Sequence, residues 1–191
     1  HFEAGFSAFA SGDVGRHAGD GDDFAFQIAE RKLEADEGAQ ILAEKDPDTR
    51  IEPASLTKLM TAYLTFSALR AGTLTPDQVV PVSQKAWRMA GSRMFIEPNK
   101  PVTVDELLRG VIVQSGNDAC VALAEVIAGS EEAFAALMNR EAQRMGLTNT
   151  HFSNSTGLPD PQLYTTARDL AVLASAIIRD FPEYYSLYSL K

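Results

Sequence analysis

Cysteine is almost missing from this sequence: Cys120 is the only one among 191 residues, so no intrachain disulfide can form. The three histidines lack the spacing of a metal site. No apolar run is long enough to span a bilayer, and no basic stripe marks a nucleic-acid surface. The N-terminus lacks the basic start and apolar run of a secretory signal, which leaves a cytosolic protein or one whose signal was removed. These absences favour a globular domain and leave its redox compartment open.

The acidic charge is concentrated near the N-terminus. The formal net charge is −9, and residues 1–50 hold 12 acidic and 5 basic side chains, a balance of −7. Residues 1–23 are rich in Gly, Ala, Ser and Asp, and we interpret them as a disordered tail or a cloning remnant. Residues 24–191 are enough for one domain with a sizeable core.

Residue patterns predict strands near the N-terminus and helices after residue 55. Residues 24–29 and 39–43 suggest a hairpin, although the charged stretch 30–37 between them is also compatible with a helix. Residues 79–82 suggest an edge strand, because Pro81 cannot donate to a ladder. We predict loops over residues 83–101 and 149–165. The first loop either forms a wall of a site cavity or simply covers the core. Cap and stop signals predict helices over about 55–71, 104–114, 118–129, 130–146 and 166–181.

Ser55 and Lys58 stand three apart at the start of the first predicted helix, so both side chains lie on one face. A serine hydroxyl needs a base before it can act as a nucleophile, and a lysine in a dry pocket can lose its proton and serve as that base. In isolation the pair favours a helix with one solvated lysine over a catalytic pair. The apolar residues that follow favour burial instead: Leu56, Leu59, Met60, Tyr63, Leu64, Phe66 and Leu69.

The triplet Ser115-Gly116-Asn117 interrupts two apolar helices. Turn chemistry alone favours a solvated turn. If both helices are buried, however, the connection faces a cleft. There Ser115 could relay a proton, and Asn117 could hold a substrate carbonyl or orient Lys58.

Together these motifs resemble the active-site serine penicillin-recognising enzymes, and within them the D-alanyl-D-alanine carboxypeptidases among the low-molecular-mass penicillin-binding proteins. The resemblance covers about residues 25–190. It rests on Ser55-Leu56-Thr57-Lys58 and Ser115-Gly116-Asn117, 60 residues apart, with the surrounding segments 53–61 and 114–120. Further matching text lies at Asn149-Thr150-His151-Phe152, Gly157-Leu158 and Ala167-Arg168-Asp169.

The resemblance implies an α+β fold of the β-lactamase/transpeptidase type, with a helical region packed on an antiparallel sheet. It implies that Ser55 attacks the penultimate D-alanine of a peptidoglycan stem peptide and that Lys58 accepts its proton. Ser115 or Lys58 would protonate the leaving D-alanine, Asn117 would bind substrate or orient Lys58, and the Ser55 N–H would form half of the oxyanion hole. β-Lactams would acylate the same serine, and no cofactor or metal is implied.

A third family motif, Lys-Thr/Ser-Gly, occurs nowhere in the chain. The resemblance places it beyond Lys191, so we expect the N-terminal portion of the domain, with the missing strand on a second polypeptide segment, and incomplete activity for these residues alone. It also implies work in the periplasm, at the outer face of the bacterial inner membrane, with peripheral attachment outside this chain. Nucleic-acid partners are not expected.

Three alternatives share the motifs. A serine β-lactamase is disfavoured because no Glu lies between Glu141 and Glu183 to activate a deacylating water, and because Gly116 replaces the usual aspartate. A D,D-endopeptidase of the same fold is a closer alternative, and an inactive scaffold that binds cell-wall peptide is a non-enzymatic one. Of the other polar residues, we interpret His151 as structural and Cys120 as buried. Arg168 and Asp169 are interpreted as a helix-capping pair.

Overall fold

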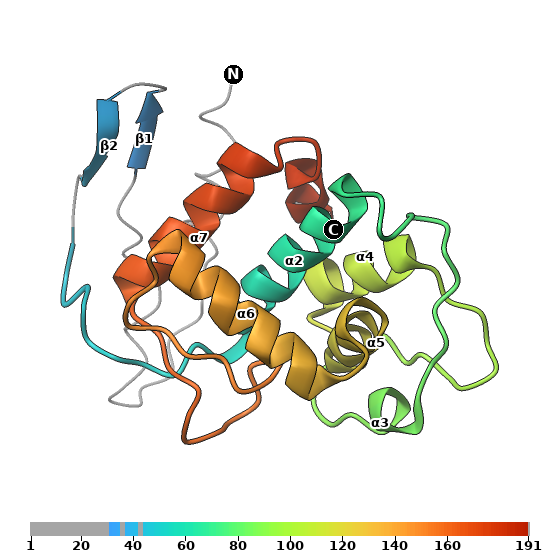
Figure 1. Ribbon diagram of the computed structural model, residues 1–191. Coiled ribbons are helices and arrows are strands. Elements are labelled where there is room, and N and C mark those ends of the chain that lie inside the picture. Colours follow the sequence, from blue (N-terminus) through green and yellow to red (C-terminus); the bar gives the residue numbers. More distant parts are fainter. Residues whose placement is uncertain (1–30, 35–36, 42–43, 191) are drawn as a thin grey trace, which may run out of the picture. The chain divides into compact units, whose positions relative to one another are not determined.

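The structure is a computed structural model that describes residues 31–34, 37–41 and 44–190 (Figure 1). The chain divides into two compact units, residues 1–46 and 47–191. The predicted strand over residues 24–29 and the predicted tail boundary at residue 23 lie outside the described residues.

In the first unit, β1 (Arg31–Glu34) pairs antiparallel with β2 (Glu37–Ile41). Arg31 lies opposite Ile41, and the register is irregular between Lys32 and Glu34. The alternative prediction of a helix over residues 30–37 is therefore wrong for Arg31–Glu34, which form a strand. The predicted strand 39–43 overlaps the end of β2. Within the described residues, β1 and β2 form a two-stranded sheet. The larger antiparallel sheet that the resemblance implies stays a prediction.

The second unit is helical (Figure 1). Its elements are η1 (Ala54–Thr57), α2 (Lys58–Arg70), α3 (Gln84–Trp87), α4 (Val104–Gln114), α5 (Asn117–Ala128), α6 (Glu131–Met145), α7 (Ala167–Asp180) and η2 (Tyr185–Ser189). Helix α2 contacts α4, α5, α6 and α7 and so forms the centre of the unit. Its buried residues Met60 and Phe66 belong to a core shared with α6 and α7, and a second core joins α3, α4 and α5.

Local capping sets most helix boundaries. Thr103 and Glu106 form the predicted capping box at the start of α4. Ser130 caps α6 and Thr166 caps α7, each accepting a backbone N–H three residues on. Gly129 and Gly146 end α5 and α6 in the left-handed conformation. These four predicted helices are confirmed to within a residue or two at each boundary.

Three details differ from the sequence predictions. The first helix begins as the 3-10 turn η1, and its α-helical part starts only at Lys58. The edge strand over residues 79–82 is wrong, because Val79 makes only an isolated bridge to Thr103 and Pro81 has no N–H to extend it. Helix α3 lies within a stretch predicted as loop, where Ser83 caps it by accepting the Ala86 N–H.

Candidate active site

Ser55 lies in η1, a 3-10 helix, in which side chains three residues apart eclipse each other. Lys58 therefore places its Nζ 3.5 Å from Ser55 Oγ. Ser55 is exposed, whereas Lys58 is only 7% exposed. The structure thus pairs a solvent-accessible hydroxyl with an amine held inside the fold.

The backbone before Ser55 adopts an uncommon conformation. Ala54 has a φ of 45°, in the left-handed region that non-glycine residues avoid. A Cβ built on Gly157 would lie 1.8 Å from the Ala54 carbonyl oxygen, and Gly157 itself has a φ of 87°. Only glycine allows the two chain segments to approach this closely. Gly157 therefore supports the turn that presents Ser55.

Ser115 follows the last residue of α4 and also has a left-handed φ, of 54°. Its Oγ donates to Ser55 Oγ over 3.2 Å. The next residue, Gly116, donates its N–H to the Gly110 carbonyl, and a Cβ there would lie 3.3 Å from that oxygen. Strained conformations persist where the surrounding structure enforces them, and they cluster at functional sites.

The environment of Lys58 favours its neutral form. Burial lowers the pKa of its amine below the ordinary value of 10.5. Its Nζ donates to the Thr156 carbonyl oxygen over 2.6 Å, and within the described residues no carboxylate forms an ion pair with it. The nearby Cys120 thiol stays neutral because burial raises its pKa to about 12. Lys58 can therefore give up a proton more readily than a surface lysine.

Asn117 is the first residue of α5 and is buried. Its Nδ2 donates to the Ala90 carbonyl over 2.8 Å, and its backbone N–H donates to Ser92. The structure thus joins Ser55, Lys58 and Ser115 by hydrogen bonds and ties Asn117 to the segment before α4. A role of Asn117 toward Lys58 or a substrate stays a prediction.

Sequence reasoning missed Asp118. Its buried carboxylate accepts the backbone N–H groups of Met94, Phe95 and Ile96 over 2.8–3.2 Å. Ile96 is buried in the core, whereas Phe95 is 70% exposed. The segment 83–101 is thus partly core cover and partly surface. An Asp one residue after Asn117 is a weak signal, because the three backbone groups that it binds in residues 94–96 lie more than 20 residues away in the sequence.

The turn over residues 154–158 lies in the loop predicted for residues 149–165, but sequence reasoning missed its contact with Lys58. Asn154 Oδ1 accepts hydrogen bonds from the Thr156 N–H, the Thr156 hydroxyl and the Gly157 N–H, and its Nδ2 donates to the Leu158 carbonyl. This arrangement fixes the Thr156 carbonyl that binds Lys58. Asn followed three residues later by Gly is the one local sign of such a turn.

Other polar residues take structural positions. His151 Nδ1 lies 2.7 Å from the Gln162 carbonyl oxygen, and Cys120 is buried. The carboxylate of Asp169 accepts the Asn149 N–H and the Thr150 hydroxyl. Within the described residues no three His, Cys, Asp or Glu side chains gather as metal ligands. No helix among them has the length and hydrophobicity to cross a membrane.

Comparisons with known proteins agree with this geometry. A family model described as D-alanyl-D-alanine carboxypeptidase matches residues 33–191. The carboxypeptidase DacC of Escherichia coli is 45% identical over 158 residues, which cover 80% of this chain and 40% of that protein. DacA of Haemophilus influenzae is 47% identical over 154 residues, which cover 79% of this chain and 39% of that protein.

Solved structures give the same match. DacD of Francisella tularensis has a TM-score of 0.79 and 42% identity, over 90% of this chain and 43% of that one. Penicillin binding protein 5 of Haemophilus influenzae has a TM-score of 0.78 and 46% identity, and the match covers 80% of this chain and 45% of that one. The chain thus spans about 40% of the length of the curated relatives it matches.

Proposed function

Because the chain belongs to the D-alanyl-D-alanine carboxypeptidase family, we propose that it carries the nucleophile and the base of a serine carboxypeptidase that removes the terminal D-alanine from peptidoglycan stem peptides. One observation carries the proposal. Ser55 Oγ lies 3.5 Å from the buried Lys58 Nζ and 3.2 Å from Ser115 Oγ, within reach of two groups that can move its proton.

In the proposed reaction, the neutral Lys58 amine takes the Ser55 proton as Oγ attacks the carbonyl carbon of the penultimate D-alanine. The bond to the terminal D-alanine breaks, and its nitrogen receives the proton from Lys58, directly or through the Ser115 hydroxyl. Water then hydrolyses the resulting ester and releases Ser55. The Ser55 N–H supplies one donor to the oxyanion, and Asn117 contributes to substrate binding.

The remaining parts of the proposal lie outside these residues. A Lys-Thr/Ser-Gly strand from another segment would bind the substrate carboxylate and complete both the oxyanion hole and the antiparallel sheet. The protein would work at the outer face of the bacterial inner membrane, with a peripheral attachment. The similar solved structures include penicillin binding protein 5 of Haemophilus influenzae and penicillin binding protein 6B of Escherichia coli, which supports acylation of Ser55 by β-lactams.

A fluorescent penicillin tests the proposal on the protein that contains these residues. We expect one covalent label per molecule, which peptide mass analysis maps to Ser55, and no label on Ser55→Ala. Release of D-alanine from a stem-peptide mimic then separates a carboxypeptidase from an endopeptidase, and fast loss of the label indicates a β-lactamase. Absence of label on the folded protein would refute the proposal and favour a peptide-binding scaffold.

A further inference from the structure

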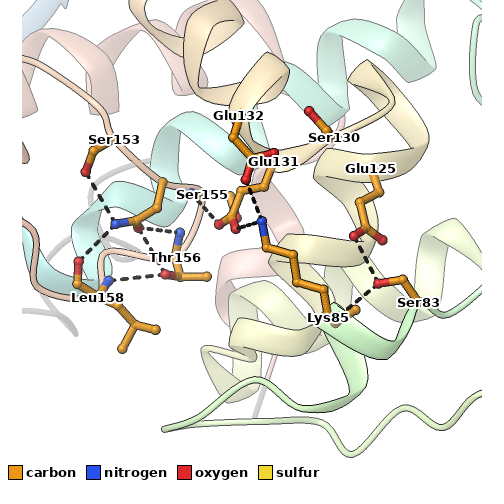
Figure 2. Close-up of polar contacts among 12 residues, drawn as sticks. Ser83, Lys85, Glu125, Ser130, Glu131, Glu132, Ser153, Ser155, Thr156 and Leu158 are labelled. Atoms are coloured by element: carbon orange, nitrogen blue, oxygen red, sulfur yellow. Dashed lines mark hydrogen bonds and ion pairs between the residues drawn. The ribbon is translucent and has the colours of Figure 1, made fainter.

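Glu131, the first residue of α6, is a buried carboxylate that the proposed reaction does not use. It is 8% exposed. One oxygen accepts the Ser155 N–H over 3.1 Å and the Ser155 hydroxyl over 2.8 Å (Figure 2). A buried carboxylate destabilises a fold unless hydrogen bonds and an opposite charge compensate it. The position of Glu131 therefore requires an explanation.

Lys85 of α3 supplies the compensating charge. Its Nζ lies 3.0 Å from the other Glu131 oxygen and 2.9 Å from Glu132 (Figure 2). The two glutamates differ in their surroundings. The Glu132 side chain is 77% exposed, and no hydrogen bond links it to the turn over residues 154–158. Glu131 alone joins Lys85 to that turn.

The turn is the same one that holds Lys58. Thr156, next to Ser155, presents the carbonyl that accepts a hydrogen bond from Lys58 Nζ over 2.6 Å. The Ser155 carbonyl in turn accepts the Thr61 hydroxyl over 2.7 Å. The dipeptide Ser155-Thr156 is thus bound by α2 through Lys58 and Thr61 and by α6 through Glu131. Asn154 holds the Thr156 end of the turn through the Thr156 and Gly157 N–H groups, whereas Glu131 holds the Ser155 end, so losing the α6 contact would remove one of the two supports of the Thr156 carbonyl.

We propose that Glu131 is a positioning residue for Lys58, acting through Ser155 and the Thr156 carbonyl. Glu131 has no hydrogen bond to Ser55 or Lys58, and its effect is transmitted along the backbone of the turn, from the Ser155 amide to the Thr156 carbonyl two peptide groups further on. The inference rests on the proposed role of Lys58 as the base. The Lys58 amine has two kinds of neighbour. The Thr156 carbonyl accepts its hydrogen bond, and the Cys120 thiol of α5 is the titratable group that interacts with it.

The test compares Glu131→Ala and Glu131→Gln with Glu132→Ala as a matched control. The control also removes a carboxylate from Lys85 but leaves the turn intact. The first measurement is the pseudo-first-order rate constant for acylation by a fluorescent penicillin. Molecules that stay unfolded during labelling lower only the amount of label and leave this constant unchanged. The second is the pKa of Lys58 from the ¹³Cε chemical shift, which needs no activity.

We expect Glu131→Ala to lower the acylation rate constant at least tenfold and to shift the Lys58 titration. Glu131→Gln, which keeps an oxygen for Ser155, should stay within about threefold of wild type, and Glu132→Ala within about twofold. If Glu131→Ala does not fold, Ser155→Ala takes its place. This variant removes one of the two hydrogen bonds between Ser155 and Glu131, and its acylation rate constant should fall between those of wild type and a tenfold loss. The proposal is overturned if the Lys58 titration and rate constant are unchanged, or if Gln is as harmful as Ala. A wild-type protein without label refutes the proposed function alone, because the Lys58 titration still tests this inference.

Discussion

Gly157→Ala is the substitution for which the structure predicts the sharpest local effect. Its added Cβ would lie 1.8 Å from the Ala54 carbonyl oxygen and 2.4 Å from the carbonyl carbon. Real Cβ atoms essentially never come within 3.0 Å of such atoms, so the two segments must separate by more than an ångström. Both contacts are with backbone, which cannot rotate away. Since Ala54 precedes Ser55, the displacement reaches the nucleophile.

Two costs add in the free energy of unfolding. The left-handed φ of 87° at Gly157 costs an alanine about 1–2 kcal/mol, and the forced contact adds about 1–3 kcal/mol. Removing conformational freedom from the unfolded chain returns about 0.4–1 kcal/mol. We therefore expect a net loss of about 3 kcal/mol. A misplacement of about 1 Å at the reacting atoms lowers a rate about 10²-fold, so acylation of Ser55 should fall by a similar factor.

Gly129→Ala is the matched control. Gly129 has nearly the same φ, 84°, but nothing lies within 4 Å of its added Cβ. It should therefore lose only about 1 kcal/mol and acylate at the wild-type rate. Urea unfolding and penicillin acylation measure the two quantities. Equal stability of the two variants, together with an unchanged acylation rate in Gly157→Ala, would refute the reasoning.

Two further predictions concern Lys58 and Asp118. The acylation rate should rise with pH as the Lys58 amine loses its proton, with a midpoint below 10.5 because burial lowers its pKa; a rate that falls as the pH rises through this range would contradict a neutral base. Asp118→Ala removes the acceptor for four backbone N–H groups, three of them in residues 94–96. It should destabilise the fold by about 3 kcal/mol and speed hydrogen exchange at Met94, Phe95 and Ile96; unchanged exchange there would argue against the Asp118 anchor.

The sequence predicted those features whose causes are local. Thr103, Ser130 and Thr166 each cap a helix through a backbone group three residues away. Such caps need no knowledge of the rest of the fold. The pairing of Ser55 with Lys58 is equally local, because one turn of helix places both on one face.

The missed features depend on contacts between distant segments. The left-handed Ala54 is explained by Gly157, more than 100 residues later. Thr156 acts through a carbonyl oxygen, which every residue carries, so its side chain gives no sign of the role. In the hairpin, the charged residues of β1 lack the alternation that marks a half-buried strand, and pattern alone did not separate strand from helix there.

The two strained residues next to the nucleophile are held by separate parts of the fold. Ala54 is supported by Gly157 and the turn that Asn154 organises. Ser115 is held by α4 and α5, through Gly116 and the Gly110 carbonyl. Since a strained backbone persists only where its surroundings over-determine it, the Ser55–Ser115 contact of 3.2 Å requires both supports at once. The site is therefore a property of packing between distant segments, which explains why residues far from Ser55, such as Glu131, are expected to affect its chemistry.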